Sequence, residues 1–143
     1  MNDASTVAEI TEAQKELAAR RLQELPLARL IGMRLTGLKI DEAVIEIDMR
    51  DDLRQPSGVL HGGITATLID TAMAFAVRTR MEPTAATATI DLSIHYLRPH
   101  TAGIAICTSK VVRAGKRIFT VSADVVNEEG KLIATALSTY TKV

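Results

Sequence analysis

The stretch HGGITATLIDTAMAFAV, residues 61–77, decides the fold of this chain. After its two glycines it holds only Ile, Leu, Met, Phe, Val, Ala and Thr, apart from Asp70, its single charged side chain. A segment this apolar predicts a helix that is buried nearly all round. An ionised carboxylate in such a helix is costly unless a polar or charged group faces it. Asp70 is therefore either a structural partner inside the core or a group kept for chemistry.

The sequence on both sides of this helix, which we expect from Gly62 to about Thr79, is typical of strands. Apolar and polar residues alternate in short runs that turn residues separate. Short connections between consecutive strands predict an antiparallel meander. We expect one α+β domain, in which a curved antiparallel sheet of about six strands wraps one long central helix. The expected strands are 33–40, 43–49, 85–97, 103–113, 117–127 and 131–141.

The strand expected at 85–97 alternates regularly, so its apolar and polar side chains should lie on opposite faces. Thr89 belongs to the polar face, from which its hydroxyl can hydrogen-bond the carboxylate of Asp70. The apolar set is Ala88, Ile90, Leu92 and Ile94.

The N-terminal segment predicts an amphipathic helix over residues 6–25, with Thr6 and Glu9 as a capping box. Pro26 interrupts it, and a further helical turn at 27–31 is expected to end at Gly32. We therefore divide the chain into a helical extension, residues 1–29, and one domain, residues 30–143.

Charge and cysteine content narrow the functional classes. The chain of 143 residues has 17 Lys and Arg against 17 Asp and Glu, so no basic surface predicts a nucleic-acid partner. Its single cysteine excludes an intramolecular disulfide, which is typical of a reducing compartment. No secretory signal and no apolar run of membrane-spanning length is recognisable. We expect a cytoplasmic protein without a membrane partner.

Gly62 and Gly63 stand where a helix begins, and backbone N–H groups at such a position have no partner within the helix. These groups suit a developing oxyanion, and each such donor lowers a barrier by about 3 kcal/mol. Asp70 follows Gly62 by eight residues, about 12 Å along the axis. A base or nucleophile acts within about 3 Å of its target. One chain therefore cannot aim both groups at one atom, and two antiparallel helices in a dimer can.

The loop before the helix offers further polar groups. The amide of Gln55 can orient a water molecule or a carbonyl group. His61 can donate a hydrogen bond to a substrate or brace the loop.

Three features occur together in this chain: Gln-Pro-x-Gly-x-Leu-His-Gly-Gly at 55–63, an acid nine residues after the histidine, and Ile-Asp-Leu-x-Ile-x-Tyr-Leu-Arg-Pro at 90–99. The combination resembles the hotdog-fold acyl-CoA thioesterases of the PaaI-like group, over roughly residues 30–143. The resemblance implies hydrolysis of an acyl- or aryl-CoA thioester without metal or cofactor.

The resemblance also implies roles for the motif residues. Asp70 would be the nucleophile or the general base, and the Gly62 N–H of the partner protomer would polarise the thioester carbonyl. Gln55 would place the carbonyl or the water, and His61 would shape the loop. Thr89 matches a position at which some relatives carry a serine, whereas Ala74 leaves empty a Ser/Thr position that other relatives use one turn after the acid.

Substrate contacts follow from the same resemblance. Gly63 would contact the substrate, and the coenzyme A nucleotide would meet Arg98, Lys116 and Arg117. The acyl group would lie between the central helix and the partner protomer. We expect a dimer at least, and the resemblance favours a tetramer. Candidate lining residues of the acyl pocket are Met33, Met49, Met73 and Phe75.

Two other functions stay open from the sequence. A hotdog-fold hydratase or dehydratase would act on acyl thioesters, but its usual His-Phe-Pro-Gly and Asp-x-Asn-Pro-x-His strings do not occur here. A non-catalytic acyl-CoA binding module would keep the fold and lack turnover.

Overall fold

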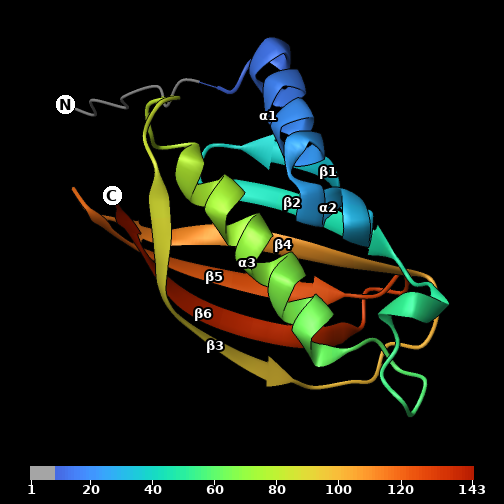
Figure 1. Cartoon of the computed structure of the whole chain (residues 1–143). Helices are drawn as coiled ribbons and strands as arrows, with labels where there is room; N and C mark the ends of the chain where they lie inside the picture. Colours follow the sequence, from blue (N-terminus) through green and yellow to red (C-terminus); the bar gives the residue numbers. More distant parts are fainter. Residues whose placement is uncertain (1–8) are drawn as a thin grey trace.

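One curved antiparallel sheet and one long helix make up most of the molecule. The computed structural model describes residues 9–143, and helix α3 lies across the concave face of the sheet (Figure 1). The six strands and the central helix confirm the α+β expectation. A short 3-10 turn, Asp51–Leu53, interrupts the loop before α3. The other elements are α1 (Glu12–Glu24), α2 (Pro26–Ile31), β1 (Arg34–Lys39), β2 (Glu42–Asp48), α3 (Gly62–Arg78), β3 (Thr87–Tyr96), β4 (Ile104–Ala114), β5 (Ile118–Val126) and β6 (Leu132–Lys142).

The strand order is β1-β2-β4-β5-β6-β3, so only part of the expected meander is confirmed. β4, β5 and β6 pair in sequence, but β3 pairs with β6 at the far edge and not with β4. Three strand spacings of about 4.8 Å separate β3 from β4. The connection 97–103 spans this distance because an extended chain covers about 3.3 Å per residue. A short loop was therefore not a sign that the strands it joins are neighbours.

A β-bulge interrupts the alternation that the sequence predicted for β3. The pairing with β6 shifts between Thr89 and Asp91, which leaves Ile90 as an extra residue with 56% of its surface exposed. The expectation that Ile90 shares the core face with Leu92 is therefore wrong. A bulge reverses the alternation on one side of it, and Thr89 turns to the helix side, as does Leu92.

The core lies between the sheet and one side of α3. Leu68, Ile69, Ala72 and Met73 of this helix are fully buried. The buried hydroxyl of Ser109 on β4 donates to the Ala72 carbonyl oxygen at 2.7 Å, which ties the sheet to the helix. The opposite side of α3 is only half-buried. Within one protomer the helix is therefore not buried on all sides, although the sequence had predicted that it would be. The half-buried residues are Thr67, Asp70, Thr71 and Ala74.

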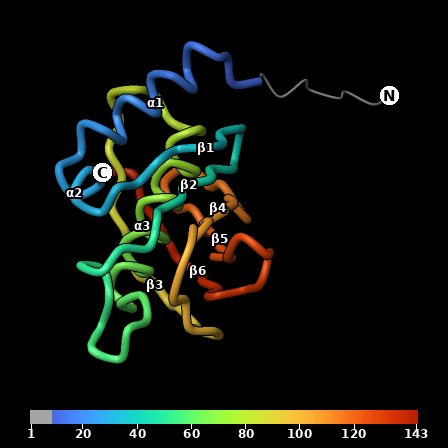
Figure 2. The backbone as a smooth tube through the Cα atoms, turned by 90° about the vertical axis from the view of Figure 1, so that its right-hand side faces the viewer, coloured from blue at the N-terminus to red at the C-terminus, as the bar shows by residue number. Residues whose placement is uncertain are grey.

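The N-terminal helix is shorter than the sequence predicted. α1 is capped by Thr11, which exchanges hydrogen bonds with Gln14 in a capping box. Thr6, the predicted cap, lies outside the described residues, and Glu9 precedes the helix. Thr11-x-x-Gln14 can satisfy backbone N–H donors in the same way as Thr6-x-x-Glu9. The sequence therefore offers two equivalent positions at which the helix could begin. Figure 2 shows α1 and α2 beside β1 at one edge of the sheet.

The second helix ends as expected. Gly32 closes α2 in the left-handed region, with φ 83°. The boundary at residue 30 between extension and domain stays a prediction.

Candidate active site

The beginning of α3 presents one unpaired backbone donor. His61 caps the helix, and its Nδ1 accepts from the Gly63 N–H at 2.9 Å. The Gly62 N–H has no acceptor among residues 9–143. Tyr96 holds the same residue in place, because its hydroxyl donates to the Gly62 carbonyl oxygen at 2.7 Å. Of the two glycines singled out in the sequence, Gly62 therefore carries the donor that is free to meet a ligand.

A cavity of about 370 Å³ opens beside this helix terminus. Its volume falls in the range of small-molecule sites, which begins at about 300 Å³. It brings together three residues that the sequence analysis selected, namely Gln55, Gly62 and Arg98. The side chain of Gln55 is folded onto Ser57, whose backbone N–H it accepts at 2.7 Å. The cavity is therefore lined by a free backbone donor, an amide and a guanidinium group.

Asp70 lies in the middle of α3, where two hydroxyl groups hold one of its oxygens. Thr89 Oγ1 donates to Asp70 Oδ1 at 2.8 Å, which confirms the expected contact. Tyr140 donates to the same Oδ1 at 2.5 Å, and its oxygen also lies 2.7 Å from the Asp70 backbone carbonyl. Hydrogen bonds to a carboxylate are among the stronger ones in proteins. They fix the carboxylate and leave Oδ2 without a partner in the described part of the chain.

Sequence reasoning missed Tyr140. Its side chain is 1% exposed, and burial, together with the hydrogen bond to Asp70, raises the pKa of its hydroxyl. The group therefore stays a protonated donor at neutral pH. The only signal in the sequence was a hydroxyl group on a strand residue expected to face the core. Such a signal does not identify the group to which the hydroxyl donates. Tyr140 faces Thr89 across the β3–β6 pair, which the meander expectation had excluded.

Other predicted residues lie apart from these groups. Gly62 and Asp70 sit on one helix, about 12 Å apart along its axis. Lys116 and Arg117 are exposed in the turn between β4 and β5, at the end of the sheet away from the cavity. Met33 and Met73 are buried in the core and line neither the cavity at the start of α3 nor the one at its end, so their place in an acyl pocket between two protomers stays a prediction.

Two further observations bear on the chemistry that the site can perform. Burial raises the pKa of the Cys107 thiol, so this residue is not a thiolate nucleophile at neutral pH. Among residues 9–143, no three His, Cys, Asp or Glu side chains come together as a metal site would require.

The comparison with known families decides what kind of protein this is. The model of the family described as "Thioesterase superfamily" matches residues 57–134, which hold α3 and most of the cavity-lining loop. The chain belongs to this superfamily. It is a thioester hydrolase with a PaaI-like hotdog fold. No helix of this thioesterase within the described residues is long and apolar enough to cross a membrane.

Individual relatives resemble the chain over most of its length. Human acyl-coenzyme A thioesterase 13 is 29% identical over 128 residues, covering 87% of this chain and 91% of the relative. The medium/long-chain acyl-CoA thioesterase YigI of Escherichia coli is 27% identical over 151 residues, covering 95% and 97%.

Solved structures show the same fold. A thioesterase family protein from Silicibacter pomeroyi superposes with a TM-score of 0.84 and 25% identity, covering 92% of this chain and 97% of that one. PaaI from the phenylacetic acid degradation operon of Escherichia coli superposes with a TM-score of 0.83 and 23% identity, covering 90% and 93%.

Proposed function

We propose that this thioesterase hydrolyses an acyl- or aryl-CoA thioester at a site that two protomers share. Asp70 of one protomer and the Gly62 N–H of the other act on the same carbonyl group. One observation carries the proposal: Thr89 and Tyr140 both hold Asp70 Oδ1, and Oδ2 has no partner among the described residues. A carboxylate held in this way is prepared to act on a substrate through its second oxygen.

The surface of α3 supports an active site that two protomers share. Its half-buried side carries Asp70 among small residues such as Thr67, Thr71 and Ala74, which let a second helix approach closely. β3 is an edge strand, and edge strands are usually covered. Two copies joined along β3 would place their α3 helices side by side and antiparallel. Residue 62 of one helix then lies opposite residue 70 of the other.

The chemistry needs only groups of the chain and water. The Gly62 N–H and the positive end of α3 stabilise negative charge on the thioester oxygen. Asp70 Oδ2 either attacks the carbonyl carbon or removes a proton from a water molecule that attacks it. The carbon–sulfur bond breaks, and the thiolate takes up a proton that the consumed water supplies. Where Asp70 is the nucleophile, this water hydrolyses the acyl anhydride formed on Asp70 and frees the carboxylate. In either case one water is consumed, and a carboxylic acid and free coenzyme A are released.

The positions of the basic residues fit coenzyme A. Arg98 lines the cavity at the start of α3, where a guanidinium group can pair with a phosphate. Lys116 and Arg117 lie at the opposite end of the sheet. In the antiparallel dimer, this end of one protomer faces the cavity end of the other. All three side chains are thus proposed to serve the nucleotide, while Gln55 and His61 shape the loop that receives the thioester.

Thiol release from a series of acyl- and aryl-CoA thioesters tests the proposal. Because the named relatives include a medium/long-chain thioesterase, the series includes decanoyl-CoA beside acetyl-CoA and benzoyl-CoA. We expect Asp70→Asn to abolish turnover while the circular dichroism spectrum and the oligomeric state stay unchanged.

Full activity of Asp70→Asn would contradict the assignment of this residue. Binding of acyl-CoA without thiol release by the wild type would instead indicate a binding module. Hydration or dehydration of an enoyl thioester without thiol release would indicate a change of reaction within the same fold.

A further inference from the structure

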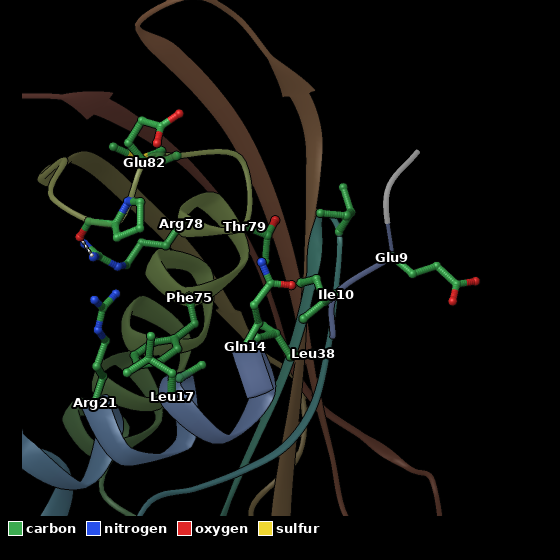
Figure 3. A pocket seen from close by; sticks show the side chains of 14 residues that line it. Glu9, Ile10, Gln14, Leu17, Arg21, Leu38, Phe75, Arg78, Thr79 and Glu82 are labelled. Atoms are coloured by element: carbon green, nitrogen blue, oxygen red, sulfur yellow. Dashed lines mark hydrogen bonds between the residues drawn. The ribbon is translucent and has the colours of Figure 1, made fainter. Parts of the chain in front are cut away.

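A second cavity lies where α1 covers the end of α3. Its volume of about 250 Å³ lies just below the range in which most small-molecule sites fall, which restricts it to a small ligand. The cavity is bounded by α1, by β1 and by the loop that follows α3. Its apolar wall includes Leu17 of α1, Leu38 of β1 and Phe75 of α3 (Figure 3). Met81 of the loop also lines it. Of the four predicted acyl-pocket residues, Phe75 alone lines one of these two cavities, and it lines this one. An apolar wall of this kind suits an alkyl chain.

Two arginines lie on one side of this cavity. Arg21 reaches in from α1 and Arg78 from α3, and both guanidinium groups lie on the same side of it (Figure 3). Neither has an ion-pair partner among residues 9–143. The lining glutamates, Glu9 and Glu82, turn their carboxylates away. Two like charges that converge beside an apolar wall repel each other unless an anion lies between them.

The hydrogen bonds of the two arginines leave donors free. Arg78 donates to the backbone carbonyl oxygens of Pro83 and Ala85, at 3.3 and 3.2 Å. The Arg21 side chain has no hydrogen-bond partner within the described part of the chain. A guanidinium group carries five N–H donors and can bind a carboxylate through two of them. The pair therefore has ample capacity for a carboxylate.

We propose that this cavity binds a fatty acid of medium length, with its chain against the apolar wall and its carboxylate on Arg21 and Arg78. The position separates this site from the proposed active site. Asp70 contacts β3 and β6, whereas the cavity adjoins β1, at the opposite edge of the sheet. Binding at this site goes beyond the proposed hydrolysis and does not depend on it.

Calorimetric titration of the full-length protein with decanoate tests the proposal, and decan-1-ol serves as the uncharged comparison. We expect decanoate to bind at least about tenfold more tightly than the alcohol, because only the carboxylate forms charge-assisted hydrogen bonds with the arginines. Arg21→Gln should weaken decanoate binding by about tenfold and leave the alcohol unaffected. Leu17→Gln should weaken both ligands. Arg78 is left intact, since it also holds the loop after α3.

Two variants serve as controls. Arg20→Gln removes an exposed arginine of the same helix that does not line the cavity, and it should leave decanoate binding unchanged. Asp70→Asn should also leave decanoate binding unchanged, whatever it does to hydrolysis, and this separates failure of the second site from failure of the proposed function.

Three results would overturn the proposal. The first is the absence of decanoate binding, and the second is equal binding by wild type and Arg21→Gln. The third is a raised KM for decanoyl-CoA in Arg21→Gln, because this would assign the cavity to the substrate's own chain.

Discussion

Two hydroxyl groups from different strands converge on a single oxygen of Asp70. Thr89 reaches it from β3 and Tyr140 from β6. Both hydrogen bonds restrict the rotation of the carboxylate. Under the proposed function, the reactive Oδ2 is aimed by groups that need not touch the substrate. Tyr140 is then a positioning residue, and its loss should affect the chemical step more than binding.

Tyr140→Phe tests this role, since it keeps the ring and removes only the hydroxyl. We expect kcat to fall about tenfold with KM changed little, because the lost interaction orients a group in the transition state. Steady-state kinetics measure kcat and KM separately. A stable variant with unchanged kcat would reduce Tyr140 to a structural role.

The contact of Thr89 could be predicted from the sequence, whereas that of Tyr140 could not. Thr89 lies on the strand that follows α3, so residue type and proximity sufficed. Tyr140 is seventy residues from Asp70 and reaches it only because β3 pairs with β6. The alternating patterns in the sequence show where the strands lie. They do not show which strands pair when a longer connection joins them. That choice depends on how the sheet closes around the helix.

The ends of α3 were the most predictable boundaries of any element. Gly62 and Gly63 after a loop, and Pro83 beyond the last apolar turn, set limits within which the helix runs from Gly62 to Arg78. The start of α1 was less predictable because two Thr-x-x-Glu/Gln patterns lie within six residues of each other. Local capping signals decide a boundary only where one candidate exists.

The free donor at the start of α3 can be removed without breaking the helix. Gly62 is its first helical residue, a position that favours proline. His61 has φ −59° and ψ 131°, the extended conformation that a residue before proline adopts. Gly62→Pro should therefore lower kcat by about 10²–10³ through loss of the N–H donor. Thiol-release kinetics and circular dichroism measure activity and helix content.

Gly62→Ala is the matched control because it keeps the N–H. Its added Cβ would lie 3.4 Å from the Tyr96 ring, an ordinary contact. We expect near wild-type activity from this variant. Equal losses in both variants would mean that the position is sensitive to bulk and that the backbone donor is dispensable.

The proposed active site exists only at the scale of the assembled molecule. Within one protomer, the free N–H of Gly62 and the free oxygen of Asp70 stand about 12 Å apart on a rigid helix, too far to act on one carbonyl. Under the proposed function, a second copy covers the half-buried side of α3 and pairs with the edge strand β3. The spacing was readable from the sequence alone. The half-buried side was not, because composition made the helix look apolar all round.

Mixing two inactive variants tests the shared site. In a hybrid dimer of Asp70→Asn and Gly62→Pro, one site carries both defects, and the other combines an intact Asp70 with an intact Gly62. Random exchange of subunits makes half of the dimers hybrid, so activity should recover to about a quarter of the wild-type value. Co-refolding the variants in equal amounts and measuring thiol release gives the result. If Gly62 and Asp70 acted within one protomer, every site in the mixture would keep one defect and no activity would return.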